Sequence, residues 1–507
     1  MHIDARSLEN DSLIEGDLCI IGAGAAGISM ALDWINSGSK VILLEGGGFD
    51  YDPAMQDLYK GTTTGVPYYP LESARLHYFG GTSGHWAGYC SPLDDLDFRE
   101  RSWVPMSGWP FGKQELDPYY AKAHELLELG PYQYDPDYWI KKEPSFEKLP
   151  LREDVIRHKV WQFSPPTRFG VKYRKPIVDA SNVWLYTYAN VSELIVDENN
   201  KQIKEVIITN HSKKTHRVNA KNFVLATCAI QNARLLLTSN KKISKGIGNQ
   251  HDLVGRCFMD HLEVICGELH MPIARSLDFY MLQFFYTKMR AEIGLSEGMQ
   301  EQSKVLNGTV AFIPKSNETS SETSTDTTSS EANAHLRGWE NAEDAFRKGQ
   351  IKKEKNPPHK IFQLFTRMEQ APNPASRITL SNEKDALGMP RPSLEWKPDG
   401  LERTSIHKLI EEIGKEFGYE NIGRIKMAEW LTNDNNDWPS SLGGAWHHMG
   451  TTRMNADPKK GVVDPNCKVH DINNLFIAGS SCFPTSGVAN PTLTLISLTL
   501  RLSAHLK

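Results

Sequence analysis

The sequence lacks the features that mark several large classes of protein. Its seven cysteines lie far apart without a Cys-x-x-Cys pair, which favours reduced, buried thiols over a disulfide framework or a metal site. No segment offers about 18 uninterrupted apolar residues, and the polar N-terminus has no secretion signal, so we expect a cytoplasmic protein without a membrane segment. The net charge is only -5 and no basic stripe occurs, which argues against nucleic acid as a partner.

The length and composition indicate a large globular protein. At 507 residues the chain exceeds the roughly 250 to 300 residues at which one hydrophobic core stops growing. Hydrophobic residues make up 39% of the sequence and charged residues 23%, as is typical of folded domains. We therefore expect two domains that share one large site.

A glycine-rich turn near the N-terminus predicts a nucleotide-binding βαβ unit. A strand-like apolar run precedes Gly22, which permits a sharp turn; Gly24 lets backbone N–H groups approach a pyrophosphate, and Gly27 lets the next helix pack against the strand. A second apolar run ends in Glu45, whose carboxylate is suited to bind a ribose diol. The pattern leaves NAD and FAD open, and its place so near the start of a long chain favours FAD.

Further strand and helix patterns occur at both ends of the chain. Residues 183–188, 223–226 and 474–479 read as strands, and a helix with an apolar face follows in 228–239. Pro491 opens a last helix. These patterns predict a nucleotide-binding domain that is interrupted by a second domain.

The middle of the chain has a different residue pattern from its two ends. We place the nucleotide-binding domain at 1–265 and 436–507 and the second, substrate-binding domain at 266–435. A low-complexity, acidic loop at about 316–355 reads as a solvated surface insertion, and the alternative is a mobile cover over the active site.

Two adjacent histidines and an asparagine suggest chemistry. His447 and His448 precede a turn, and Asn490 stands directly before the last helix. Each has an ordinary structural explanation, because a lone histidine is most often a core residue and an asparagine before a helix is most simply an N-cap. Taken one by one, they do not indicate catalysis.

Together with the glycine-rich turn, these segments resemble the GMC (glucose-methanol-choline) family of flavoenzymes. That family combines an N-terminal FAD fingerprint with an H-x-x-G-T-x-x-M segment, matched here by His447, Gly450, Thr451 and Met454, and with a final His or Asn, matched by Asn490. Residues 107–110, 228–239, 252–261 and 369–380 are similar to other family segments. The resemblance is closest to the branch with pyranose 2-oxidase, fructose dehydrogenase and gluconate dehydrogenase.

The resemblance implies the fold and the cofactor. The fold is α/β (α+β overall): a Rossmann-like FAD-binding domain interrupted by a substrate domain with a mainly antiparallel sheet and helices, similar to p-hydroxybenzoate hydroxylase. The implied FAD-binding residues are Gly22, Gly24, Ala25, Gly27, Glu45, Gly81, Thr82, Ser83, His85, Trp86, Ala87, Val191, Gly479, Asn490, Pro491 and Thr492.

The implied chemistry is the oxidation of an alcohol. A base takes the hydroxyl proton while the carbinol hydrogen passes to flavin N5 as a hydride. The H-x-x-G-T spacing selects His447 over His448 as the base, and a histidine has an ordinary pKa of about 6.5. Asn490 would donate an N–H to the alcohol oxygen, and the N-terminus of the helix from Pro491 would favour an anionic reduced flavin.

The segment GGTSGHW, residues 80–86, resembles the one in pyranose 2-oxidase whose histidine carries the flavin 8α-methyl bond. It leaves open whether His85 binds FAD covalently or only packs beside it. Ala87 replaces the threonine found at this place in pyranose 2-oxidase, which favours a dehydrogenase over an oxidase.

The branch acts on sugars and polyols, which implies a sugar, a polyol or a sugar-bearing natural product such as a glycoside or an aminoglycoside as substrate. We expect oxygen, a quinone or another electron acceptor to take the electrons. Whether the protein forms a homo-oligomer stays open. Two alternatives also stay open: a hydroxynitrile lyase with structural FAD, and the flavoprotein subunit of a cytochrome-linked dehydrogenase.

Overall fold

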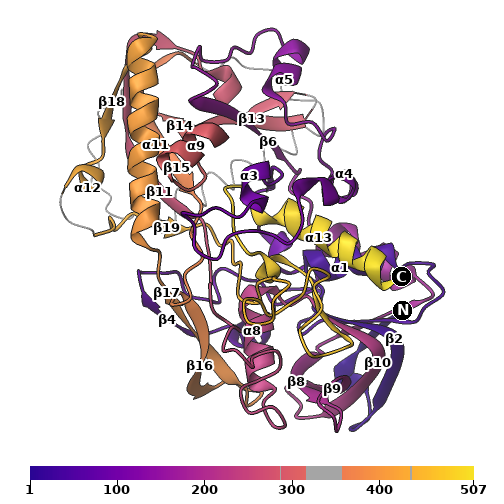
Figure 1. The fold of residues 1–507 in the computed structure, drawn as a ribbon. Coiled ribbons are helices and arrows are strands. Elements are labelled where there is room, and N and C mark those ends of the chain that lie inside the picture. The colour runs from indigo at the N-terminus through magenta and orange to yellow at the C-terminus, as the bar shows by residue number, and fades with distance from the viewer. Residues whose placement is uncertain (286, 316–356, 434–436) are drawn as a thin grey trace.

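A sheet of mostly parallel strands contains the glycine-rich turn. The computed structural model describes residues 1–285, 287–315, 357–433 and 437–507 (Figure 1). The parallel part of the first sheet runs in the order β1 (His2–Asp4), β7 (Val183–Thr187), β3 (Val41–Leu44), β2 (Leu13–Ile21) and β10 (Thr215–Leu225), and β20 (Leu475–Ile477) also pairs with β10 in parallel. β9 (Ile203–Thr209) and β8 (Asn190–Val196) add an antiparallel edge. Segments from both ends of the chain thus share one Rossmann-like sheet, as predicted.

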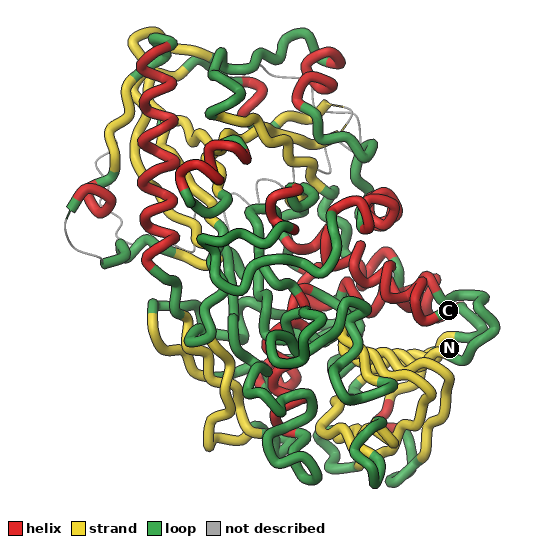
Figure 2. The backbone as a smooth tube through the Cα atoms, in the orientation of Figure 1, coloured by secondary structure: helices red, strands yellow, loops and turns green. Residues whose placement is uncertain are grey.

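Two helices that contact each other, α1 (Ala25–Asp33) and α13 (Pro491–Leu506), lie beside this sheet. α1 follows the turn after β2, and α13 lies next to α1 and α4 (Asp117–Leu126) (Figures 1 and 2). Trp34 donates its indole N–H to the Ser503 hydroxyl at 3.0 Å, and the Tyr120 and Thr494 hydroxyls lie 2.9 Å apart. α13 begins at a proline, which supplies the preset φ of a first helical residue.

A second sheet is antiparallel throughout its described strands. Its order is β18 (Arg424–Met427), β11 (Leu262–Arg275), β15 (His359–Met368), β14 (Gly308–Pro314), β13 (Thr287–Leu295), β6 (Ile156–Phe163) and β5 (Tyr89–Cys90), with β12 (Gln283–Phe285) on β13 and β19 (Gly443–Gly444) on β11. This is the mainly antiparallel sheet that the family resemblance implied.

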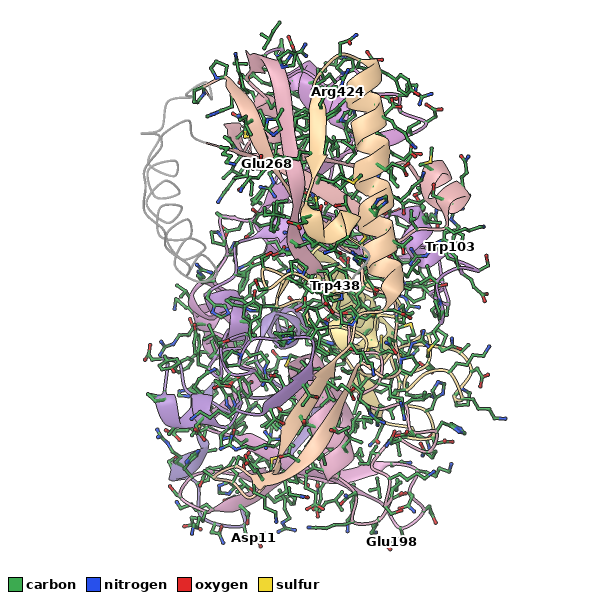
Figure 3. The ribbon with its side chains drawn as sticks, turned by 90° about the vertical axis from the view of Figure 1, so that its left-hand side faces the viewer. Asp11, Trp103, Glu198, Glu268, Arg424 and Trp438 are labelled. Atoms are coloured by element: carbon green, nitrogen blue, oxygen red, sulfur yellow. The ribbon has the colours of Figure 1, made fainter. Side chains whose placement is uncertain are left out.

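α11 (Gly400–Tyr419) covers one face of the second sheet. Its buried residues Ile406, Ile410, Ile413 and Phe417 recur every three or four positions and form one apolar stripe. Figure 3 shows the helix against the sheet, with Glu268 and Arg424 labelled on neighbouring strands, while Asp11 and Glu198 label the opposite end of the molecule.

A small third sheet and short helices complete the described structure. The third sheet joins β16 (Arg377–Lys384), β17 (Pro390–Trp396) and β4 (Thr62–Gly65). The remaining α-helices are α2 (Pro53–Asp57), α3 (Asp95–Phe98), α5 (Pro136–Lys142), α6 (Phe169–Lys172), α7 (Arg174–Asp179), α8 (Cys228–Thr238), α9 (Glu297–Ser303) and α12 (Glu429–Thr432). Among the described residues, no helix has the length and apolar character needed to cross a membrane.

The predicted domain boundaries stay a prediction. β5 and β6 precede residue 265 in the sequence, yet they pair in the second sheet because β6 finds its antiparallel partner in β13. The loop predicted at 316–355 lies outside the described residues.

Candidate active site

A cavity of about 740 Å³ gathers almost all predicted site residues. Its wall contains His447 and His448 together with Gly22, Gly24, Ala25, Glu45, Gly81, Thr82, Ser83, His85, Trp86, Ala87, Val191, Gly479, Asn490, Pro491 and Thr492. Gly27 is the exception: a Cβ there would lie 1.9 Å from the Gly22 carbonyl oxygen, so Gly27 lets α1 pack onto the turn. Segments far apart in the sequence therefore meet at one cavity.

The backbone at the turn fits the pyrophosphate of FAD. Gly22 has a φ of +101°, which disfavours other residues. A Cβ added to Gly24 or to Gly479 would meet no protein atom within 4 Å, although both residues line the cavity. A phosphate could thus approach the bare backbone at the N-terminus of α1.

Glu45 directly follows β3 and lies beside this turn. Its carboxylate accepts hydrogen bonds from the backbone N–H groups of Ala23 at 3.0 Å and Gly47 at 2.9 Å. Burial raises the pKa of Glu45 to about 7, and these hydrogen bonds act in the opposite direction. Since a carboxylate oxygen accepts more than one hydrogen bond, a ribose hydroxyl can still bind here.

Asn490 does not act as a simple N-cap. It occupies the N-cap position of α13, but its side chain makes no capping hydrogen bond. Its Nδ2 instead lies 3.0 Å from His447 Nε2, and its Oδ1 is buried without a hydrogen-bond partner in the described part of the chain. The asparagine and the predicted base therefore form a pair in the cavity wall.

A third histidine touches the other side of His447. His261 Nδ1 lies 2.8 Å from His447 Nδ1, and His261 Nε2 lies 2.8 Å from the carbonyl oxygen of Gly487. Burial lowers the pKa of His261 to about 3. Burial, and then the neighbouring His261 and Arg367, hold the pKa of His447 well below its ordinary value, so His447 is neutral near pH 7.

Asp260 anchors the loop that carries His447. Its carboxylate accepts the backbone N–H groups of His447 at 2.8 Å, of Ala445 and Trp446 at 3.1 Å each, and of His261 at 2.7 Å, and also the hydroxyl of Tyr68. Trp446 has a φ of +61°, an uncommon conformation for a bulky residue. The carboxylate thus holds a strained turn beside the predicted base.

His448 has different surroundings. Its ring packs 5.5 Å from Phe258 and 6.1 Å from Tyr68, measured between ring centroids. Burial lowers the pKa of His448 to about 3. Its Nε2 is buried without a hydrogen-bond partner among the described residues and the residue lines the cavity, so the contact with Asn490 is what distinguishes His447 from it.

His85 lies at the same end of the cavity as His447. Its ring stacks on Trp446 with centroids 5.6 Å apart, and its Nε2 is buried with no hydrogen-bond partner among the described residues. Burial and then Arg168 lower the pKa of His85 to about 4, so the ring is neutral. A buried neutral nitrogen without a partner fits a residue that contacts a cofactor.

Several residues of the site carried no recognisable sequence signal. Asp260 and His261 fall in the segment 252–261, which is similar to the family, but their partners lie far along the chain. Glu263, Arg290 and Arg367 also line the cavity, from strands of the second sheet. Arg367 pairs with Glu263 at 2.7 Å.

Comparisons with known proteins find similar oxidoreductases. Residues 372–499 match the family model described as GMC oxidoreductase. The chain is 23% identical to 2-methyl-1,2-propanediol dehydrogenase of Mycolicibacterium austroafricanum, over 96% of this chain and 94% of that protein. It is 24% identical to the fructose dehydrogenase large subunit of Gluconobacter japonicus, over 97% and 98%. A solved structure of formate oxidase from Aspergillus oryzae matches with a TM-score of 0.58 at 16% identity, over 99% of each chain.

These comparisons support an FAD-dependent oxidoreductase. Its residues 372–499 are similar to the GMC oxidoreductase family, and nearly the whole chain is similar to dehydrogenases named for alcohol and sugar substrates.

Proposed function

We propose that the protein oxidises a CH–OH group of a sugar or polyol to a carbonyl, with His447 as the base and Asn490 assisting. The observation that carries this proposal is the pair in the cavity wall, with His447 Nε2 and Asn490 Nδ2 3.0 Å apart. A substrate hydroxyl would take the place of the amide at the His447 Nε2 lone pair, and its oxygen would accept an N–H of Asn490.

The two residues have complementary roles. The Nε2 lone pair of neutral His447 takes the hydroxyl proton, and the Asn490 N–H stabilises the negative charge that develops on the oxygen. Bound FAD supplies the acceptor for the carbinol hydrogen and its electron pair. The lowered pKa of His447 supports the base role because the ring stays unprotonated near neutral pH.

The other predicted positions would hold the cofactor. The turn at Gly22 and Gly24 and the bare backbone at Gly479 are suited to the pyrophosphate, and Glu45 is suited to the ribose. Asn490, Pro491 and Thr492 present the N-terminus of α13 to the cavity, where a helix dipole favours negative charge. His85 would contact FAD, and a covalent bond to the cofactor would use its Nε2, which has no hydrogen-bond partner among the described residues.

The substrate class rests on the relatives and on three charged side chains in the cavity wall. Two similar proteins are named for a diol and for fructose. Glu263, Arg290 and Arg367 add charged groups to the cavity wall that also contains His447, and such groups suit a substrate rich in hydroxyls. Ala87 supports a dehydrogenase that uses a quinone or another acceptor in preference to oxygen.

Anaerobic titration of the holoenzyme tests this function. D-fructose, 2-methyl-1,2-propanediol, gluconate and an aminoglycoside are added one at a time, and the visible absorbance of the flavin is followed. We expect bleaching with at least one alcohol, and faster recovery with a quinone than with oxygen. Flavin that stays oxidised with every alcohol would contradict the proposal and favour a lyase.

A further inference from the structure

We propose that His261 is a positioning residue that fixes which nitrogen of His447 carries the proton. The inference rests on the proposed role of His447 as the base. It goes further by assigning the tautomer of that base and the residue that sets it.

The assignment starts at a backbone carbonyl. His261 Nε2 lies 2.8 Å from the oxygen of Gly487, and a carbonyl oxygen can only accept a hydrogen bond. His261 Nε2 must therefore carry a hydrogen. A neutral imidazole has one N–H, so Nδ1 of a neutral His261 is an acceptor.

The next contact transfers this constraint to His447. The two Nδ1 atoms are 2.8 Å apart, and one of them must donate. The His261 side chain is fully buried, and burial lowers its pKa to about 3. The ring therefore does not become doubly protonated near neutral pH. Since His261 Nδ1 accepts, His447 Nδ1 carries the hydrogen and His447 Nε2 keeps its lone pair.

The contact between Asn490 and His447 agrees with this assignment of the hydrogens. Asn490 Nδ2, which can only donate, lies 3.0 Å from His447 Nε2, which can then only accept. The opposite tautomer would place two N–H groups against each other at Asn490 and two lone pairs against each other at His261. The chain from Gly487 through His261 to His447 thus leaves the lone pair of His447 Nε2 on the side of the cavity, where it accepts from Asn490 and where a substrate hydroxyl would take the place of that amide.

The contact between His447 and His261 also stabilises His447 after proton transfer. When His447 Nε2 has taken the hydroxyl proton, its Nδ1–H still donates to His261 Nδ1, so the cationic ring keeps an acceptor. The described structure provides no carboxylate bonded to the His447 ring, and His261 occupies the place where an orienting group is needed.

The tautomer can be measured without a substrate. In the oxidised holoenzyme labelled with ¹⁵N-histidine, the resonances of His447, assigned by comparison with His447→Gln, report which nitrogen is protonated. We expect Nδ1–H for His447 and Nε2–H for His261. An Nε2–H tautomer of His447 would overturn the proposal, whether or not the protein oxidises alcohols.

Variants test the consequence for the reaction. In His261→Leu we expect the anaerobic rate constant of flavin reduction by the alcohol that bleaches wild type most to fall about 10- to 100-fold, less than the roughly 100- to 10,000-fold that a general base contributes. The concentration of alcohol that gives half the maximal rate should not change, because His261 lies behind His447. His261→Asn keeps an acceptor near the former Nδ1 and should recover part of the rate.

His124→Leu is the matched control. His124 is buried and also bonds a carbonyl, that of Gly130 at 2.9 Å, and a side chain, Tyr134 at 3.0 Å, but it lies in α4. We expect this variant to keep the wild-type rate. Equal losses in His261→Leu and His261→Asn, or a wild-type rate in His261→Leu, would overturn the positioning role. If His261→Leu does not fold, the tautomer of the wild type decides.

Discussion

Replacing Asp260 by alanine should destabilise the loop at residues 445–447, which carries the predicted base His447. The carboxylate accepts four backbone N–H groups, those of His261, Ala445, Trp446 and His447, besides the Tyr68 hydroxyl. Alanine leaves these donors without an acceptor in a buried place. Trp446 would also lose a contact that holds its left-handed backbone, which costs roughly 1–2 kcal/mol in a non-glycine residue.

The size of the effect follows from these bonds and from the burial of the charge. A hydrogen bond to a charged group contributes about 1.5–3 kcal/mol. The bonds share two oxygens and one loop, and burial raises the pKa of Asp260 to about 7, which means that desolvation of the charged carboxylate outweighs the stabilisation that these bonds give it. We therefore expect Asp260→Ala to lower stability by about 3–5 kcal/mol, at the upper end for one substitution.

The activity of Asp260→Ala should also fall, because loss of these hydrogen bonds would displace His447. A shift of about 1 Å in a reacting group can lower a rate roughly 100-fold. The assays are the midpoint of thermal unfolding at a fixed FAD concentration and the anaerobic rate of flavin reduction. Asp260→Asn is the control, because its Oδ1 can still accept from Ala445, His447 and His261, so its losses should be smaller.

The pH dependence gives a second check. Because the folded pKa of Asp260 is raised, the folded protein binds this proton more tightly than the unfolded chain, and stability falls as pH rises from about 4, the ordinary value, toward 7. Asp260→Asn should lack this component. An alanine variant that melts and reduces flavin like the wild type would refute the reasoning, as would an asparagine variant that is worse than alanine.

Three further predictions concern the base and the cofactor. The rate of flavin reduction should stay level as pH falls through about 6.5, the ordinary histidine value, because the pKa of His447 lies well below it; a rate that halves near that pH would be inconsistent with this. The yellow colour should stay with acid-precipitated wild type and be released from His85→Ala, and release from both would show that FAD is not covalently bound. Gly24→Val should reduce FAD content in the purified protein because its side chain would project into the cavity, whereas Gly400→Ala, on α11 with open space around it, should keep wild-type content.

The sequence predicts the parts of the site that are local in the chain. Gly22, Gly24 and Gly27 with Glu45 follow one βαβ pattern, and Pro491 marks the start of α13. The structure gives these residues positions that agree with the pattern, because each depends on the backbone geometry of one turn or one helix end.

Other parts depend on contacts between distant segments. Nothing near Asp260 and His261 in the sequence indicates that they meet the loop at residues 445–447. Asn490 carries a normal N-cap signal, and only the contact with His447 separates its role from capping. Likewise β6 lies early in the chain and joins the second sheet through β13, which a strand pattern alone cannot specify.

The central claim is that His447 removes the hydroxyl proton while bound FAD accepts the carbinol hydrogen. Anaerobic stopped-flow reduction of wild type and His447→Ala by D-fructose or 2-methyl-1,2-propanediol, at matched flavin content, tests it most directly. The account predicts that the alcohol bleaches the wild-type flavin and that the variant is slower by roughly 100- to 10,000-fold. Equal rates in the two proteins, or no bleaching of the wild type by any alcohol, would contradict it.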